Sequence, residues 1–355
     1  MISLGFITIE EQQEMEYCTE IAKRAGRYGI AVYRFTPLDI DPLTEKVHGR
    51  AFDEKRQAWT KSTFDIPSFL YDRCFYRSDI RSKKCKPIMQ WLKRRPDLVF
   101  LGYGFPGKWD VYEKMIEHPL LSPYVPKTAR LQSSADILRM IRREQAVICK
   151  PEHGAGGRGI YVIQKAERKL HIRDASGQTT ALVGQKSELE QWISTLLQQH
   201  SYLIQPFLPL QTKENEPFDV RFLFQKDGTG KWIERCRAVR VGHPGMFIAN
   251  VRAGADVRDF SGWIRSFPSP QRILIIDGIE TIIRALPSYM DEQFGPLFEL
   301  GIDIGITKEG GVWIIDVNSK PGRKIVAALH PDKKDDVYEA PLQYCLFLAN
   351  EVNIL

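Results

Sequence analysis

The sequence is poor in cysteine, and none of its six cysteines stands near another. They lie at positions 18, 74, 85, 149, 236 and 345, so there is no C-x-x-C pair, and no histidines occur at zinc-finger spacing. A chain of 355 residues is too long to need disulfide staples. We therefore expect reduced thiols in a cytoplasm and no metal–thiolate site.

The chain also lacks a long hydrophobic run. No segment approaches the ~18 consecutive apolar residues of a membrane helix. The opening MISLGFITIEEQQ has neither a basic N-terminal region nor a cleavable apolar core. The sequence therefore predicts a soluble, cytoplasmic protein with no membrane partner.

Positive charge is only mildly in excess. Lys and Arg number 50 against 44 Asp and Glu, and the excess lies in short runs such as RSKKCK (81–86), KRR (93–95) and RR (142–143). Such a chain suits phosphate ligands but lacks the dense basic stripe of a nucleic-acid-binding protein, so no nucleic-acid partner is expected. Repeats and low-complexity tails are absent as well, so nearly all of the chain should fold, as two or three domains.

What the sequence does contain is an alternation of strand-like and helix-like segments. The first hundred residues predict a small parallel α/β layer, with strands at 2–9, 30–36, 69–75 and 98–104 and a helix at 10–25. The segment GYGFPGK (102–108) breaks the pattern and marks a boundary. Beyond it we expect helices at 133–145, 187–199 and 271–300, and strands at 146–152, 159–166, 169–175, 218–227, 231–242 and 311–318.

The glycine-rich stretch HGAGGRG (153–159) matches the G-x-G-x-x-G spacing of a dinucleotide pocket. That pocket requires a helix directly after the third glycine, whereas the residues that follow here, IYVI, favour a strand. A glycine loop between two strands predicts a hairpin that folds over a ligand and offers backbone N–H groups to phosphates, with Lys150 just before it. The alternative is a solvated hairpin turn.

A second informative stretch is GIDIGITKEGGVWIIDVNSKPG (301–322). It predicts two strands joined by KEGG. Asp316 and Asn318 are two apart and share a face of the second strand, and Asp303 lies within cross-strand reach. Two carboxylates and an amide oxygen suit magnesium. The alternative is that Asp and Asn at a strand end only form a turn.

Two arginines between these stretches carry a third hypothesis. Asp219 and Arg221 alternate on one expected strand, and Arg237 and Arg240 lie on the next. Arg221 and Arg240 could neutralise the charge on a transferred phosphoryl group, with Asp219 orienting a guanidinium. The alternative is a row of surface ion pairs between strands.

Taken in order, these pieces resemble the blocks of the ATP-grasp superfamily. The likeness covers about residues 100–325 and is carried by the segments GKWDVYEKM, SPYVPKT, KPEHGAGGRG, YLIQPFLPL, FDVRF, RAVRVG, IANVRAG and LGIDIGI with WIIDVNSKPG. Within the superfamily the sequence is most similar to the YheC/YheD group of endospore-coat-associated proteins. The glutamate-adding ribosomal-protein ligases and the glutathione synthetases are more distant relatives.

The resemblance implies an α/β protein in which a small N-terminal parallel α/β domain (1–107) precedes a two-lobed ATP-grasp domain with antiparallel sheets. One lobe, 108–204, would carry the glycine flap, and the other, 205–355, the metal site. The resemblance also implies a role for each site residue. Lys108 and Lys150 would bind the ATP phosphates, and Gly154, Gly156, Gly157 and Gly159 would form the flap over them. Gln205, Phe207 and Leu208 would hold adenine, Asp303, Asp316 and Asn318 would hold Mg²⁺ or alternatively Mn²⁺, and Arg221, Arg240 and Asn250 would face the γ-phosphate. Relatives often have glutamate where this chain has Asp316, which puts the bridging of two metal ions in doubt.

The implied activity is an ATP-dependent ligation of a carboxylate to an amine through an acyl-phosphate. The substrates would be an amino acid, peptide or protein, and association with the spore coat and a homo-oligomeric state are open. Two other hypotheses stay open: a non-catalytic ATP-binding structural protein of the spore coat, and an ATP-grasp kinase. The loop 255–271, with Arg258, Trp263 and Arg265, is a candidate for substrate contact or for surface packing.

Overall fold

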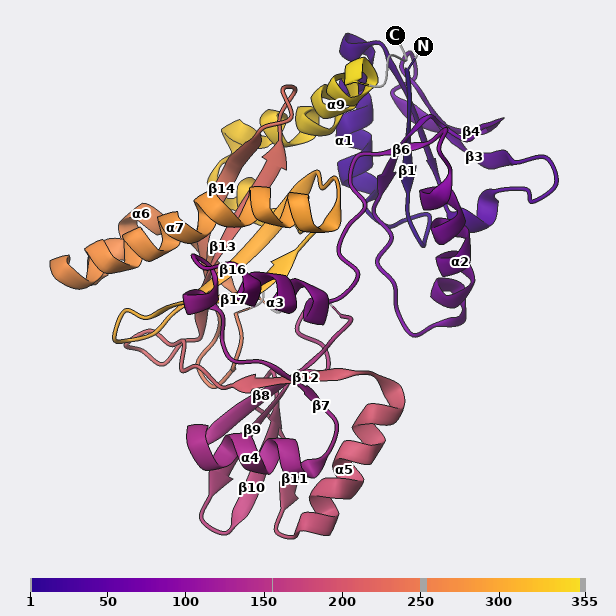
Figure 1. Cartoon of the computed structure of the whole chain (residues 1–355). Helices are drawn as coiled ribbons and strands as arrows, with labels where there is room; N and C mark the ends of the chain where they lie inside the picture. The colour runs from indigo at the N-terminus through magenta and orange to yellow at the C-terminus, as the bar shows by residue number, and fades with distance from the viewer. Residues whose placement is uncertain (1, 155, 250–253, 352–355) are drawn as a thin grey trace.

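The computed structural model describes residues 2–154, 156–249 and 254–351. In these ranges the chain forms three sheets, each assembled from one continuous stretch of sequence (Figure 1). None of the helices in these ranges is long and apolar enough to cross a membrane.

The first sheet has the strand order β4-β3-β2-β1-β5-β6. Its strands are β1 (Ile2–Ile7), β2 (Ile30–Phe35), β3 (Lys46–Asp53), β4 (Ala58–Asp65), β5 (Phe69–Asp72) and β6 (Val99–Phe100). β2, β1, β5 and β6 are parallel, as predicted, and β3 and β4 extend them as an antiparallel hairpin. The sequence analysis missed this hairpin because only Val47 of β3 is buried, so apolar alternation is almost absent there.

Two helices cover opposite faces of the first sheet. Because side chains alternate along β1, Leu4 and Phe6 join the core under α1 (Met15–Ala25), whereas Ile7 joins the core under α2 (Ile80–Arg94). β1 and β5 are adjacent parallel strands, so the residues that follow them lie side by side at the carboxyl edge of the sheet.

The second sheet is antiparallel, with the order β11-β10-β9-β8-β12-β7. It contains β7 (Ala129–Leu131), β8 (Ala146–Pro151), β9 (Tyr161–Ala166), β10 (Lys169–Asp174), β11 (Thr179–Val183) and β12 (Tyr202–Pro206). Its apolar core packs under α4 (Ser134–Glu144) and α5 (Lys186–Gln199). Each of these helices begins with a capping box, which satisfies free N–H groups of its first turn.

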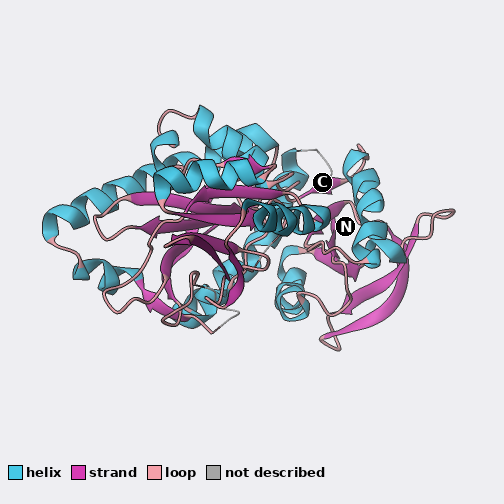
Figure 2. Ribbon diagram, turned by 90° about the horizontal axis from the view of Figure 1, so that it is seen from below, coloured by secondary structure: helices cyan, strands magenta, loops and turns pink. Residues whose placement is uncertain are grey.

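The third sheet is also antiparallel, with the order β15-β14-β13-β16-β17. It contains β13 (Phe218–Lys226), β14 (Trp232–Val241), β15 (Asp256–Asp259), β16 (Glu299–Ile306) and β17 (Val312–Asn318). The long helix α7 (Ser269–Phe294) covers one face (Figure 2). The helix predicted to extend to residue 300 thus ends at Phe294, and β16 begins at Glu299.

Four α-helices remain among the described residues: α3 (Lys108–Glu117) lies between the first and second sheets in the sequence, α6 (Phe260–Trp263) follows β15, and α8 (Lys324–Leu329) and α9 (Lys334–Glu351) follow β17. α9 packs against α1, so Val337, Ala340 and Cys345 share an apolar core with Cys18 and Ile21. The α/β class, with a parallel-centred sheet followed by antiparallel sheets, is confirmed, while the domain limits 107/108 and 204/205 stay predictions.

Candidate functional site

A strip of charged side chains crosses one face of the third sheet. Asp219 pairs with Arg240, Arg221 with Asp303, and Asp303 with Asp316 on neighbouring strands. Directly paired residues share a face of the sheet. The residues that alternate with them, among them Val220 and Ile302, point into the apolar core under α7, so the same alternation that builds this core directs the charges to the other face.

Within this strip two arginines and two aspartates form a compact quartet. Arg240 donates to Asp219 from Nε at 2.6 Å and from Nη2 at 2.7 Å. Asp303 Oδ1 lies 2.9 Å from both Arg240 Nη2 and Arg221 Nη1. The four side chains are only 10–13% exposed, so these are not surface ion pairs.

Burial and neighbouring charges oppose each other in the quartet. Burial raises the pKa of Asp219 to about 6, although the Arg240 guanidinium opposes the shift. Burial also lowers the pKa of Arg221, whereas at Arg240 burial is outweighed by the carboxylates of Asp219 and Asp303, which raise the pKa. Asp303 Oδ1 and Arg221 Nη1 are buried and form an ion pair at 2.9 Å, but this contact lacks the geometry of a hydrogen bond. Buried polar atoms normally form hydrogen bonds, so the quartet keeps hydrogen-bonding capacity for a ligand and is a candidate binding surface.

Arg237 does not join this strip. Its guanidinium pairs with Glu234 at 2.6 Å and with Glu280 of α7 at 3.1 Å, and it lies over the Phe222 ring. Arg237 and Arg240 are an odd number of residues apart on one strand, which places them on opposite faces.

Two lysines from other elements reach the edge of the same strip. Lys108 is the first residue of α3, and its Nζ lies 3.0 Å from Asp316 Oδ2. Lys150 on β8 donates from Nζ to the Ile315 carbonyl at 3.3 Å. Asn318 donates from Nδ2 to Asp316 Oδ2 at 3.1 Å, which leaves its amide oxygen available. Three sequence-predicted site segments therefore meet at one place.

Burial and the neighbouring charges shift the pKa values of Lys150 and Asp316. Burial lowers the pKa of Lys150 to about 8, and the ammonium of Lys108 acts in the same direction. Burial alone would raise the pKa of Asp316, but the charges of Lys108 and Lys150 outweigh it and hold that pKa below its ordinary value. The site thus holds two lysines beside an ionised carboxylate, a charge balance that favours an anionic ligand.

The glycine stretch forms the turn between β8 and β9. Gly156, Gly157 and Gly159 have positive φ of 74°, 77° and 70°, which favours glycine, and a strand follows, as the sequence predicts. Gly154 lies in the same turn without a positive φ. A Cβ at Gly159 would lie 2.9 Å from the Tyr202 hydroxyl and 3.0 Å from Pro151 Cγ.

The predicted adenine-holding residues lie at the end of β12 and directly after it. Gln205 donates to Thr128 Oγ1 at 2.7 Å, and the Phe207 N–H donates to the Ala146 carbonyl at 3.0 Å. The Phe207 ring meets the Phe247 ring edge-on at 5.4 Å. Leu208 follows directly and accepts from the Leu210 N–H. Asn250 lies outside the described residues.

Of the loop suggested for substrate contact, Trp263 packs in the apolar core against Phe218, at 4.8 Å between ring centroids. Arg258 is exposed beside Glu216 at 3.4 Å. Arg265 is also exposed and donates to the Ser261 carbonyl. Of the two roles considered for this loop, substrate contact and packing, the position of Trp263 fits packing.

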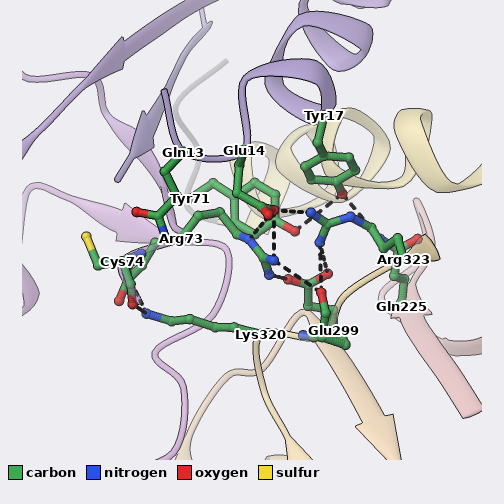
Figure 3. A network of polar contacts seen from close by, with 12 residues as sticks. Gln13, Glu14, Tyr17, Tyr71, Arg73, Cys74, Gln225, Glu299, Lys320 and Arg323 are labelled. Atoms are coloured by element: carbon green, nitrogen blue, oxygen red, sulfur yellow. Dashed lines mark hydrogen bonds and ion pairs between the residues drawn. The ribbon is translucent and has the colours of Figure 1, made fainter. Parts of the chain in front are cut away.

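The sequence analysis missed a buried ionic network beside the site (Figure 3). Arg73 is fully buried, donates to Glu14 at 2.9 Å and to the Pro321 carbonyl at 3.1 Å, and pairs with Glu299. Arg323 pairs with the same two glutamates. Because Pro321 and Arg323 follow Asn318 closely, the network ties the end of β17 to the first sheet. Its partners lie between 24 and 309 positions apart in the sequence, so no local pattern reveals it.

A family model for YheC/D like ATP-grasp proteins matches residues 97–348. The chain belongs to this ATP-grasp family. It is 38% identical over 355 residues, covering 99% of this chain and 97% of its relative, to the endospore coat-associated protein YheC of Bacillus subtilis (strain 168). The resemblance drawn from the sequence segments is confirmed at this level.

Solved structures show the same fold as this ATP-grasp chain. D-cycloserine synthetase DcsG superposes with a TM-score of 0.59 at 12% identity and covers 98% of this chain and 99% of its own. D-alanyl-alanine synthetase A from Vibrio cholerae O1 biovar eltor str. N16961 superposes with a TM-score of 0.57 at 11% identity, covering 97% of each chain. The chain is therefore an ATP-grasp protein with ligase-type structural neighbours.

Proposed function

We propose that this protein is an ATP- and magnesium-dependent ligase that joins a carboxylate to an amine through an acyl-phosphate. The observation that supports it most is the convergence of Lys108, Lys150 and Asp316, from three different elements, beside the buried Arg221–Arg240 quartet. Stability alone gives little reason to gather so many charges in a partly buried place, because buried ion pairs rarely repay their desolvation.

In this proposal the two lysines bind the ATP phosphates from one side, and the glycine turn (154–159) covers them from the other. Its glycines allow backbone N–H groups to approach phosphate oxygens closely. The segment Gln205–Leu208 holds the adenine, with the ring of Phe207 as an apolar surface. Arg240 and Arg221 face the reacting phosphoryl group, where guanidinium charge stabilises the transition state.

The residues at the end of β17 fit a magnesium ion. Asp316 and the amide oxygen of Asn318 are hard oxygen donors, and Asp303 lies opposite Asp316 on β16, where its Oδ1 is paired with Arg221 and Arg240. When bound, the ion would neutralise phosphate charge and orient the transferred group. The described residues hold no cluster of three or more His, Cys, Asp and Glu side chains, so bound nucleotide would have to supply further ligands.

The proposed reaction has two steps. A substrate carboxylate oxygen attacks the γ-phosphorus, the bond to the β-phosphate bridging oxygen breaks, and ADP leaves. The amine then attacks the acyl carbon, phosphate leaves with the C–O bond electrons, and the amine nitrogen loses a proton to solvent. Closure of the glycine turn keeps water away from the acyl-phosphate.

The decisive experiment measures ADP and phosphate release by the full chain with magnesium and a panel of amino acids and peptides, with products identified by mass spectrometry. Lys150→Ala and Asp316→Asn should each lower turnover about a hundredfold or more. Lys165→Ala and Glu309→Gln, which change exposed residues of neighbouring segments, should leave it unchanged.

The outcomes separate the alternatives. Release of both ADP and phosphate, dependent on a carboxylate and an amine together, supports ligation. ADP with a phosphorylated hydroxyl product would instead indicate a kinase, and ATP binding without turnover a structural role. Full activity in both site variants would refute the site assignment.

We also propose that the protein associates with the spore coat in its source organism. The support is the name of the Bacillus subtilis relative, which calls that protein endospore coat-associated. Immunodetection in purified coat fractions and in the cytoplasmic fraction tests this, and detection in the cytoplasm alone would contradict it.

A further inference from the structure

The positive charge of this chain is concentrated in one short segment. Residues 77–97 hold eight Lys and Arg against two Asp, an excess of six, and the whole chain has a net charge of +6. The rest of the chain is therefore balanced. Two of the three basic runs noted in the sequence lie in this segment, most of which is helix α2.

The exposed face of α2 carries cations that lack acidic partners. Lys83, Lys84, Lys86 and Arg94 are exposed, and none forms an ion pair with a carboxylate in the described ranges. Arg81, at the start of the helix, donates to the Ile9 carbonyl and the Thr36 hydroxyl, and the Lys86 ammonium lies 5.6 Å from the centroid of the Tyr76 ring. None of these contacts neutralises the positive charges, which leaves them available to an anionic partner.

Apolar side chains are set among these cations. Ile80 is 73% exposed and Trp91 38% exposed. With Lys84, Pro87 and Arg94 they occupy positions 80, 84, 87, 91 and 94, which is the spacing of one helix face. The opposite face, with Cys85, Met89 and Leu92, is buried against the first sheet.

The basic face begins beside the candidate active site. The carboxylate of Asp72, at the end of β5, pairs with Lys320 at 2.6 Å and Lys93 of α2 at 2.9 Å. Lys320 also donates to the Cys74 carbonyl at 3.1 Å, and Figure 3 shows this side chain reaching across from the segment after β17. Lys320 is two residues beyond Asn318. A chain lying on α2 could thus lead directly to the proposed metal site.

We propose that the exposed face of α2 binds an acidic polypeptide segment and so selects an acidic peptide or protein as the substrate. This inference rests on the proposed ligase function. Carboxylates of the segment would meet Lys83, Lys84, Lys86 and Arg94, and apolar side chains would meet Ile80 and Trp91. About 22 Å of helix, at 1.5 Å per residue, spans six or seven residues of extended chain.

Other anionic partners fit this face less well. The inner apolar side of α2 is covered, so Ile80 and Trp91 alone offer too little apolar surface for insertion into a membrane. The Arg95 guanidinium lies 5.1 Å from the centroid of the Trp91 ring and covers one of its faces, which hinders stacking with a nucleic-acid base.

The test is a binding measurement without ATP. We would follow fluorescence anisotropy of a labelled peptide with eight Glu and two Leu, and of the same peptide with Gln for Glu. We expect binding of the acidic peptide only, weakening with salt because exposed charges are screened. The triple variant K83Q/K84Q/K86Q should lose about tenfold in affinity, whereas R139Q/R142Q/R143Q, with the same loss of charge on exposed residues of α4, should bind as wild type.

Three results would overturn the proposal: equal weakening in the two triple variants, tighter binding of a single-stranded oligonucleotide, or tighter binding of phosphatidylglycerol vesicles. Thermal unfolding and ATP binding check that both variants are folded. Because the peptide assay needs no turnover, peptide binding without ligation would contradict only the proposed function. Ligation of neutral substrates alone would contradict only this inference.

Discussion

Lys150 shows how one residue takes its properties from the fold. The sequence placed it before a glycine turn, and the structure adds a backbone carbonyl partner on β17 and the neighbouring charge of Lys108. A lysine whose pKa is about 8 in the free protein is only partly protonated in mildly alkaline solution. Phosphate would hold the protonated form.

We therefore expect ATP affinity to be nearly full at about pH 7 and to fall as the pH rises through 8. Binding must then take up a proton, so the loss approaches tenfold per pH unit until the pKa of the nucleotide-bound lysine is reached. Isothermal titration in buffers of different ionisation enthalpy would measure both the affinity and the proton uptake. Lys150→Arg stays charged and should flatten the profile, and an unchanged slope in that variant would contradict the assignment.

Individual residues also mark the limit of what sequence can predict. Asp303, Asp316 and Asn318 could be proposed as metal ligands because they lie on two adjacent strands whose alternation of apolar and polar residues is visible in the sequence. Glu14, Arg73 and Arg323 could not, because their contacts join positions up to 309 residues apart and depend on how the sheets pack.

Among the elements, the β8–β9 turn carries the sharpest conformational demand. Gly159 has a φ of 70°, and a Cβ added to it would lie within 3.0 Å of two other atoms. Gly154 has no positive φ, and a Cβ added to it would lie 3.6 Å from its nearest neighbour. The two glycines belong to one motif but differ in what they tolerate.

Gly159→Ala should destabilise the turn by about 1–3 kcal/mol and weaken ATP binding, because alanine is strained in this conformation. Gly154→Ala should change stability by no more than about 0.5 kcal/mol. Chemical unfolding and ATP titration of both variants provide the comparison. Equal losses of stability and of ATP affinity in the two variants would show that the left-handed conformation at position 159 is not needed for either.

The burial of each strand explains which strands could be predicted from the sequence. β13, β14 and β17 were predicted because apolar residues recur along them, and these residues belong to the core under α7. The hairpin β3–β4 extends the sheet with mostly exposed side chains, so its residues carried no comparable signal.

At the scale of the molecule, the Arg73 network joins the first sheet to the third. Arg73→Ala would leave Glu299 buried, with Arg323 as its remaining partner at 3.4 Å. Removing one partner of a buried ion pair costs about 3–5 kcal/mol, and we expect that loss in urea unfolding. Lys46→Ala removes an exposed pair with Asp65 and should cost less than about 1 kcal/mol. Equal midpoints for the two variants would show that the network does not hold the sheets together.

The packing of α9 on α1 has a consequence for synthesis. Translation makes α1 before α9, and segments usually begin to fold as they leave the ribosome. Here the apolar surface of α1 that contains Cys18 and Ile21 is completed by Val337, Ala340 and Cys345, about three hundred residues later in the sequence. The nascent chain must therefore carry an uncovered hydrophobic surface while all the residues between the two helices are made, until α9 packs on α1.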